Sequence, residues 1–245
     1  MTGICAARYR PVPRWSFLYV GMMTGHADVK KVYGGGKAGT VDMNGYSLAA
    51  YWTHKGAKDW YLDAVLQGTR YADAQAKSER GQKIRPDGWG LAASLEAGYP
   101  IALGNKGWAL EPQAQIIYQW ISLSNDSDAY GRVKFDDSHA WYGRVGARLT
   151  KDWTTGKGKK ASVWARANLW HSFDSQTKTT FNSFDGQNPV GMKTKLGGTW
   201  GQVGLGVSGQ LTPRLTAFAN GDYNVNLGSQ SGHSFGGRLG LRYEF

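Results

Sequence analysis

The residues that most resemble catalytic machinery are the four consecutive positions Asp136, Asp137, Ser138 and His139. Carboxylates beside a histidine are general acid–base groups, and such a set could activate water for peptide hydrolysis. His139, however, has the same parity as Trp141, so a regular strand turns it to the apolar side and not into a cleft. The sequence supplies no base and orienting partner around it. We therefore expect no enzymatic activity.

Metal and cofactor chemistry finds equally little support. The chain has one cysteine, Cys5, so neither a disulfide framework nor a cysteine cluster is possible within it. His26, His54, His171 and His233 are far apart, and no spacing among them resembles a metal site. We expect no cofactor and no metal.

The segment 235–245 shows which elements must position any functional side chain, because apolar residues alternate there with polar residues or glycine. Period-two alternation is typical of a β-strand with one apolar and one polar face. A transmembrane β-barrel is built from such strands, since its outer face meets lipid and its inner face meets water or packed polar groups. The pattern recurs at about 46–53, 60–67, 91–101, 108–124, 141–150, 163–170, 199–211 and 214–227, with Phe218 as an exception, and segment 15–23, which is apolar on both faces, is a further strand candidate. The sequence therefore predicts ten strands.

Connection lengths favour a membrane barrel over a soluble β protein. Short connections at 55–59, 104–107 and 211–214 separate long ones at 25–42, 72–87, 125–138 and 174–198, and 151–160 and 228–234 are intermediate. Bacterial outer-membrane barrels have short periplasmic turns and long outer loops. We expect an all-β, antiparallel up-and-down barrel, with residues 1–14 irregular, residues 15–245 forming the barrel, and both ends in the periplasm.

Tryptophan spacing supports the same fold. Trp108 and Trp120 share parity on one predicted strand, and Trp141 and Trp153 share parity on the next. Twelve residues at roughly 3.3 Å each, tilted near 45°, span roughly 28 Å, which approximates the apolar band of a barrel. We expect these four residues to form the aromatic girdles on the lipid face. No segment approaches the roughly 20 apolar residues that a spanning helix needs.

Composition agrees with this interpretation. The 245 residues include 35 glycines and 13% aromatic residues, and the formal net charge is +11. The lysines and arginines are scattered through turns and alternate strand positions, without a basic helix or stripe. We expect no nucleic-acid binding. The positive charge fits an anionic lipid surface and a cationic barrel interior.

Seven charged residues have inward parity on the predicted strands. A lumen with both signs can pair charges across the barrel and hold a polar helix or a hydrated chain in transit. The predicted lumen-facing residues are Asp63, Glu96, Glu111, Arg144, Arg148, Arg166 and Arg238.

Four stretches resemble the C-terminal translocator barrel of AIDA-like (type V) autotransporters. They are 21–26 (GMMTGH), 94–100 (SLEAGYP), 110–115 (LEPQAQ) and 236–245, within a resemblance that runs from about residue 15 to residue 245. It implies a barrel in the outer membrane of a Gram-negative bacterium, surrounded by lipid and lipopolysaccharide. It also implies a passenger domain outside this chain and a last strand that the barrel-assembly machinery reads through Arg238, Gly240, Tyr243 and Phe245.

The resemblance also implies a twelve-stranded barrel with a helix in its pore, whereas about ten strands are predicted here. We therefore expect an N-terminally truncated chain, whose unclosed barrel would leave two unpaired edges in lipid. In that family, acidic residues inside some barrels support passenger cleavage. Asp63, Glu96 and Glu111 are candidates by parity, and structural ion pairing is the alternative. A small porin-like channel, an outer-membrane protease and a nonfunctional remnant remain alternative functions.

Overall fold

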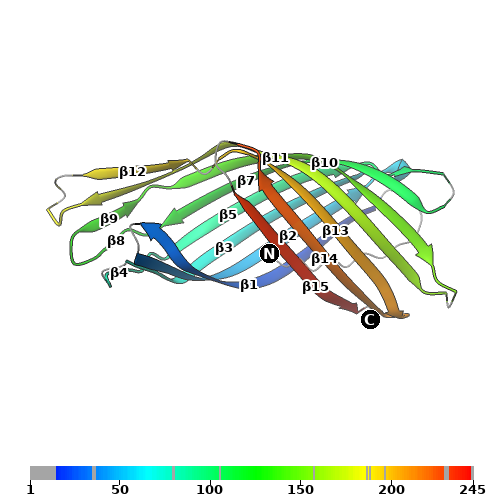
Figure 1. Cartoon of the computed structure of the whole chain (residues 1–245), viewed down its shortest axis with the longest axis horizontal. Helices are drawn as coiled ribbons and strands as arrows, with labels where there is room; N and C mark the ends of the chain where they lie inside the picture. Colours follow the sequence, from blue (N-terminus) through cyan, green and yellow to red (C-terminus); the bar gives the residue numbers. More distant parts are fainter. Residues whose placement is uncertain are drawn as a thin grey trace.

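The computed structural model describes residues 15–34, 37–78, 81–104, 106–156, 158–185, 187, 189–195, 197–228 and 232–243. The predicted irregular segment 1–14 lies outside them. Figure 1 shows one continuous sheet of long strands that curls on itself. Among the described residues, no helix is long and apolar enough to cross a membrane.

Ten strands follow one another along the main path of the sheet. They are β1 (Trp15–Gly34), β2 (Lys37–Lys55), β3 (Tyr61–Lys77), β5 (Gly88–Gly98), β7 (Trp108–Leu123), β10 (Ser138–Thr154), β11 (Lys160–Asn182), β13 (Thr199–Thr212), β14 (Leu215–Asn226) and β15 (His233–Tyr243). The remaining elements are the 3₁₀ turn η1 (Ala57–Asp59), β4 (Lys83–Ile84), β6 (Ile101–Ala102), β8 (Asp126–Ser127), β9 (Arg132–Phe135) and β12 (Val190–Lys195).

Every neighbouring pair on this path is antiparallel, from β1 with β2 to β14 with β15. The predicted all-β, up-and-down architecture is thus confirmed. In the part of the chain that the structure describes, the pairings run from β1 to β15 and do not return to β1. The sheet is a half-barrel with two free edges.

The long connections differ from the prediction, because most of their residues are β-structure. β1 and β2 pair from Trp15 with Lys55 as far as Gly34 with Lys37, so segment 25–42 is a hairpin and not an open loop. β11 likewise continues to Asn182 and pairs there with β9 and β12. Backbone groups in these segments gain ladder partners, which satisfies them better than an extended loop would. The strand extensions and β4, β8, β9 and β12 gather at one end of the sheet (Figure 1).

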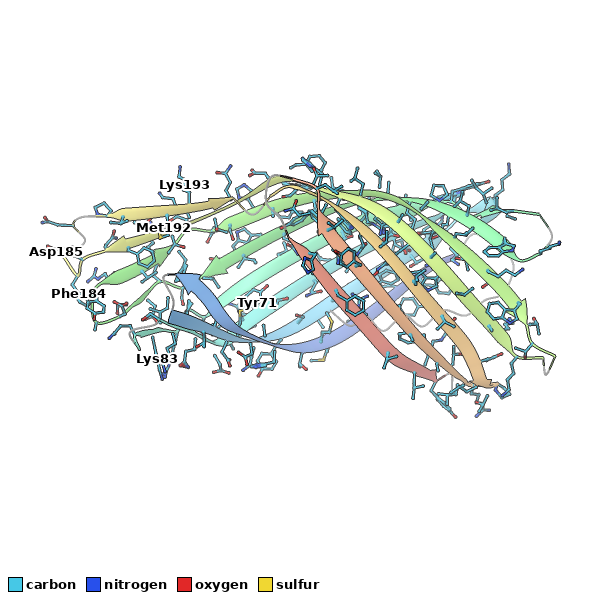
Figure 2. The ribbon with its side chains drawn as sticks, in the orientation of Figure 1. Tyr71, Lys83, Phe184, Asp185, Met192 and Lys193 are labelled. Atoms are coloured by element: carbon cyan, nitrogen blue, oxygen red, sulfur yellow. The ribbon has the colours of Figure 1, made fainter. Side chains whose placement is uncertain are left out.

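The β11–β12 hairpin ends in a polar turn. Figure 2 shows Phe184 and Asp185 at the far tip of this end of the molecule, with Met192 and Lys193 further back along β12. The Asp185 carboxylate accepts hydrogen bonds from the Ser183 hydroxyl and from the backbone N–H of Gln187 (3.0 Å). Both bonds lower the pKa of Asp185, and the bond from Ser183 has the larger effect. The Asp185 side chain itself is fully exposed.

The two faces of the sheet differ sharply in chemistry. Large apolar side chains lie on the outer face, and Met22 and Leu239 expose 86% and 85% of their surface. The inner face carries polar residues that are nonetheless buried: Arg144 and Asn168 are each 6% exposed, and Asp222 is 8% exposed. A soluble protein places apolar groups inside, so this inverted arrangement indicates that the outer face meets lipid.

Phe218, the exception to the alternation of its strand, lies on the inner face opposite Gly240 of β15. A Cβ atom added to Gly240 would lie 2.2 Å from Cζ of the Phe218 ring. The ring thus occupies the space above the glycine backbone, a cross-strand contact that fixes the register of an edge strand.

We predict that Gly240→Val reduces the assembled fraction of the protein, because overpacking at such a contact costs about 1–3 kcal/mol. The measurement is the fraction of chain with altered gel mobility in unheated against boiled membrane samples. Gly236→Val is the matched control, since Gly236 has nothing within 4 Å of its added Cβ on the same face of the same strand. Adding Phe218→Ala to Gly240→Val should restore assembly. Equal losses in the Gly236 and Gly240 variants would contradict the proposed contact.

Candidate functional site: the polar inner wall

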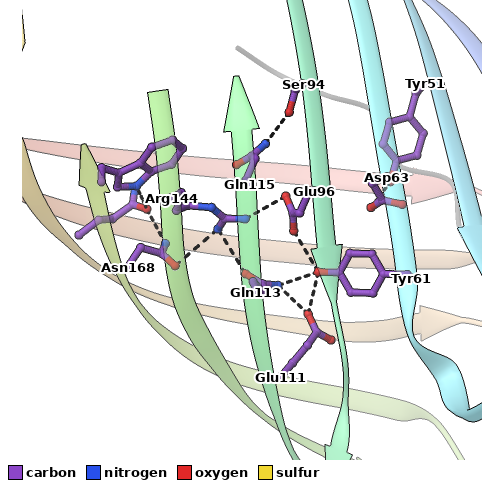
Figure 3. A network of polar contacts seen from close by, with 12 residues as sticks. Tyr51, Tyr61, Asp63, Ser94, Glu96, Glu111, Gln113, Gln115, Arg144 and Asn168 are labelled. Carbon is purple, nitrogen blue, oxygen red and sulfur yellow. Dashed lines mark hydrogen bonds and ion pairs between the residues drawn. The ribbon is translucent and has the colours of Figure 1, made fainter. Parts of the chain in front are cut away.

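The strongest candidate site is a hydrogen-bonded network on the inner wall of β3, β5, β7, β10 and β11 (Figure 3). Each strand contributes alternate residues to it, since inward parity repeats every second position. Glu96 lies opposite Asp63 and Gln115 in the sheet, and Arg144 lies opposite Gln115 and Trp170. The network therefore joins predicted lumen-facing residues that are far apart in the sequence.

Arg144 is the centre of this network. Its guanidinium forms an ion pair with Glu96 (Nη2 to Oε2, 2.9 Å) and donates to Oε1 of Gln113 (3.2 Å) and Oδ1 of Asn168 (3.5 Å). Its Cζ lies 5.5 Å from the centroid of the Trp170 ring, within cation–π range. A buried arginine needs such partners, because an unpaired charge away from water is costly.

Tyr61 links the two glutamates that the sequence predicted to face the lumen. Its hydroxyl lies 2.9 Å from Oε1 of Glu96 and 3.2 Å from Oε1 of Glu111. Gln113 donates to both the Tyr61 hydroxyl (2.9 Å) and Glu111 (2.6 Å). Sequence reasoning missed Tyr61 and Gln113 as members of the site, although their inward parity was available as a signal.

Asp63 stands beside this network. Its Oδ2 accepts a hydrogen bond from the Tyr51 hydroxyl (2.6 Å), and its buried Oδ1 has no protein partner among the described residues. Of the three acidic residues considered for passenger cleavage, Glu96 is engaged in an ion pair and Glu111 in amide and phenol bonds. Glu96 thus takes part in the ion pairing that the sequence left as an alternative, and a role of the three residues in cleavage stays a prediction.

A second polar cluster continues the inner wall over β11, β13 and β14. Arg166 forms an ion pair with Asp222 and donates to it through Nε (3.0 Å). The Cζ atoms of Arg166 and Arg148 lie 5.3 Å and 6.0 Å from the Trp164 ring centroid. Further along the same face, the Trp170 and Trp200 rings stack with centroids 5.6 Å apart. Arginine side chains and aromatic rings therefore lie next to one another on this wall.

Three of the four predicted assembly residues, Arg238, Gly240 and Tyr243, lie on β15, at a free edge of the sheet. Arg238 is exposed, pairs with Asn220 and shares inward parity with Gly240, whereas Tyr243 is 52% exposed on the outer face. Phe245 lies outside the described residues. The role of these residues in assembly stays a prediction.

The four predicted girdle tryptophans fall near the ends of β7 and β10. Trp108 pairs with Lys151, and Trp120 pairs with His139, so the two members on β7 mark opposite ends of that strand. Trp108, Trp141 and Trp153 are 40%, 42% and 41% exposed. Their contact with the membrane interface stays a prediction.

The side chains of Asp136 and His139, from the acid–histidine set at 136–139, contact different partners and form no common site. His139 lies 3.4 Å from Asp174 and is 55% exposed, whereas Asp136 faces Lys178 (3.5 Å) and Lys134 (3.9 Å). In the described residues, no group of three or more histidine, cysteine, aspartate or glutamate side chains could hold a metal ion.

Comparison with known proteins gives a consistent picture. The family model "Autotransporter beta-domain" matches residues 13–222. The chain is 29% identical over 226 residues to the adhesin BmaC autotransporter of Brucella suis and 28% identical over 195 residues to the pertactin autotransporter of Bordetella bronchiseptica. These matches cover 86% and 78% of this chain, but only 6% and 20% of those relatives.

Solved structures share the fold. The β domain of the Bordetella autotransporter BrkA aligns with a TM-score of 0.68 at 24% identity, over 95% of this chain and 86% of that one. The transport unit of AIDA-I from Escherichia coli aligns with a TM-score of 0.67 at 18% identity, over 96% and 79% of the two chains.

We predict that Arg144→Met destabilises the assembled protein by about 2 kcal/mol. This cost is smaller than that of removing one partner from a fully buried ion pair, because Glu96 keeps some access to water. The loss leaves Glu96 without its cation. The urea midpoint of the heat-modifiable form measures the effect. Arg148→Met is the control and should cost less than about 1 kcal/mol, since among the described residues Arg148 donates a single long bond, to Thr150 (3.4 Å), and lies 6.0 Å from the Trp164 ring centroid. Equal losses in both variants would show that Arg144 is not the centre of the network.

Proposed function

Because the chain belongs to the autotransporter β-domain family, we propose that it is the translocator through which a passenger domain reaches the cell surface. Autotransporter β domains sit in the outer membrane of Gram-negative bacteria, and this is the location of the chain. The chain spans 6% of BmaC and 20% of pertactin, so the passenger itself lies outside the match.

The observation that carries the proposal is the polar inner wall centred on Arg144. Two of its arginines form ion pairs within the wall, Arg144 with Glu96 and Arg166 with Asp222. A hydrated polypeptide can slide along a polar surface on which such charges are already paired. Folding of the passenger outside the cell would supply the direction of transport.

Three partners follow from this proposal. The barrel-assembly machinery would read the last strand through Arg238, Gly240, Tyr243 and Phe245. Lipid and lipopolysaccharide would contact the outer face, with Trp108, Trp120, Trp141 and Trp153 at the membrane interfaces. Further strands would pair with the free edges at β1 and β15, because open sheet edges are not tolerated in hydrocarbon.

A chimera tests the function. Residues 15–245 replace the matching part of the BrkA β domain, and the BrkA passenger and the N-terminal part of that domain are kept. We predict that the passenger becomes accessible to protease added to intact cells. Gly240→Val in the same chimera should abolish this exposure, while Gly236→Val should leave it intact.

A heat-modifiable barrel in the outer membrane with no surface passenger would contradict the translocator proposal. The alternatives have their own signatures. A porin-like channel would conduct well in planar bilayers as the isolated chain. A protease would cleave peptides and lose that activity in Asp136→Ala or Asp137→Ala. A nonfunctional remnant would give no heat-modifiable band.

A further inference from the structure

Arg70 is a charged residue on the apolar outer face of the sheet. It lies opposite Tyr46 on β2 and Trp89 on β5, and these aromatic side chains are 52% and 58% exposed. Arg70 lies in the half of β3 that leads to a long connection, opposite the second residue of β5, and so on the outer-leaflet side of the wall. An arginine there must meet a polar partner, since a cation facing hydrocarbon is costly.

The protein compensates this arginine only in part. Its guanidinium donates to Oδ2 of Asp87 (2.8 Å) and to the carbonyl oxygen of Gly88 (3.2 Å), and its Cζ lies 5.2 Å from the Trp89 ring centroid. A guanidinium has five N–H donors, so these two bonds leave donors for an external anion. The Arg70 and Asp87 side chains are 36% and 47% exposed, and both are accessible from outside.

Below Arg70 the outer face is hollowed. Gly68, between Leu48 and Leu91, has nothing within 4 Å of an added Cβ, so the surface dips directly beneath the arginine. Next along the strands, a groove of about 410 Å³ crosses the wall, with an almost entirely apolar lining. Its lining includes the small side chains Ala50, Ala64 and Ala93.

We infer that Arg70, Trp89 and this groove form a binding site for one lipopolysaccharide molecule of the outer leaflet. Arg70 would bind a phosphate of its glucosamine headgroup, since arginine pairs well with phosphate oxygens. Tyr46 and Trp89 would pack against the sugar rings, and an acyl chain would run past Gly68 into the groove. The remaining N–H donors of Arg70 beside Tyr46 and Trp89 suit a headgroup that carries both phosphate and sugar rings, which favours this glycolipid over a phospholipid.

Asp87 sharpens the inference, because it competes with the phosphate for Arg70. If the site binds an anionic headgroup, then Arg70→Gln and Asp87→Asn should act in opposite directions. If the Arg70–Asp87 pair only stabilises the fold, then both substitutions should act in the same direction on stability and neither should change lipid retention.

The test uses the full chain, purified from outer membranes in mild detergent and washed. Retained lipid is measured by mass spectrometry as 3-hydroxy acyl chains, which mark lipopolysaccharide, and separately as phospholipid acyl chains. We expect Arg70→Gln to lower lipopolysaccharide retention about fivefold to tenfold, as for a lost charge-assisted bond. Asp87→Asn should raise it, and Ala93→Phe, which fills the groove, should lower it.

Lys151→Gln is the matched control, because Lys151 also lies over an outer-face tryptophan (5.3 Å from the Trp108 ring centroid) but at the opposite end of the wall. It should leave retention unchanged. Unchanged retention in Arg70→Gln, an equal loss in Lys151→Gln, or retained lipid that is only phospholipid would each overturn the inference. This site depends on outer-membrane location but not on transport, so normal retention with a failed chimera would count against the translocator proposal alone.

Discussion

In hydrocarbon, every backbone N–H and C=O group needs a partner from the protein, and the rest of this structure depends on that constraint. The antiparallel ladders from β1 to β15 meet it for the interior strands. They also impose period two on the side chains, which separates the outer face of Leu239 and Met22 from the inner face of Arg144 and Asn168. The same constraint disfavours open edges in hydrocarbon, and the described half-barrel has one such edge at β1 and one at β15.

The inner wall shows how charges are tolerated in such a sheet. Arg144 is almost fully buried, yet it has a carboxylate, two amide oxygens and an aromatic face as partners. Arg166 and Asp222 repeat the arrangement further along the wall. These paired charges keep the wall polar while binding one another, which suits passage of a chain better than selection of a ligand.

The outer wall is less uniform than a lipid-facing surface needs to be. A surface that only had to contact lipid would need apolar residues alone. Here Arg70, the rings of Tyr46 and Trp89, and a groove lined by small side chains lie close together on β2, β3 and β5. The lipid around an outer-membrane barrel differs between leaflets, so a specific site on one leaflet would also fix the depth and orientation of the barrel. The inner and outer walls thus make separate contributions to the behaviour of one sheet.

The sequence by itself determined the ten strands, their faces and the family, because alternation and turn spacing are local properties that a single chain displays. It did not reveal that much of segments 25–42 and 174–198 continues as β-structure. These segments are polar and show no alternation, and their strands form because they pair with neighbouring strands. Parity placed Glu96 and Arg144 on one face, but only register brought them within 2.9 Å and added Tyr61 and Gln113. Register also aligned Arg70 with Trp89 and explained why Phe218 faces Gly240. These contacts join residues far apart along the chain, and their distances are set by how the strands align and curl, which no local pattern encodes.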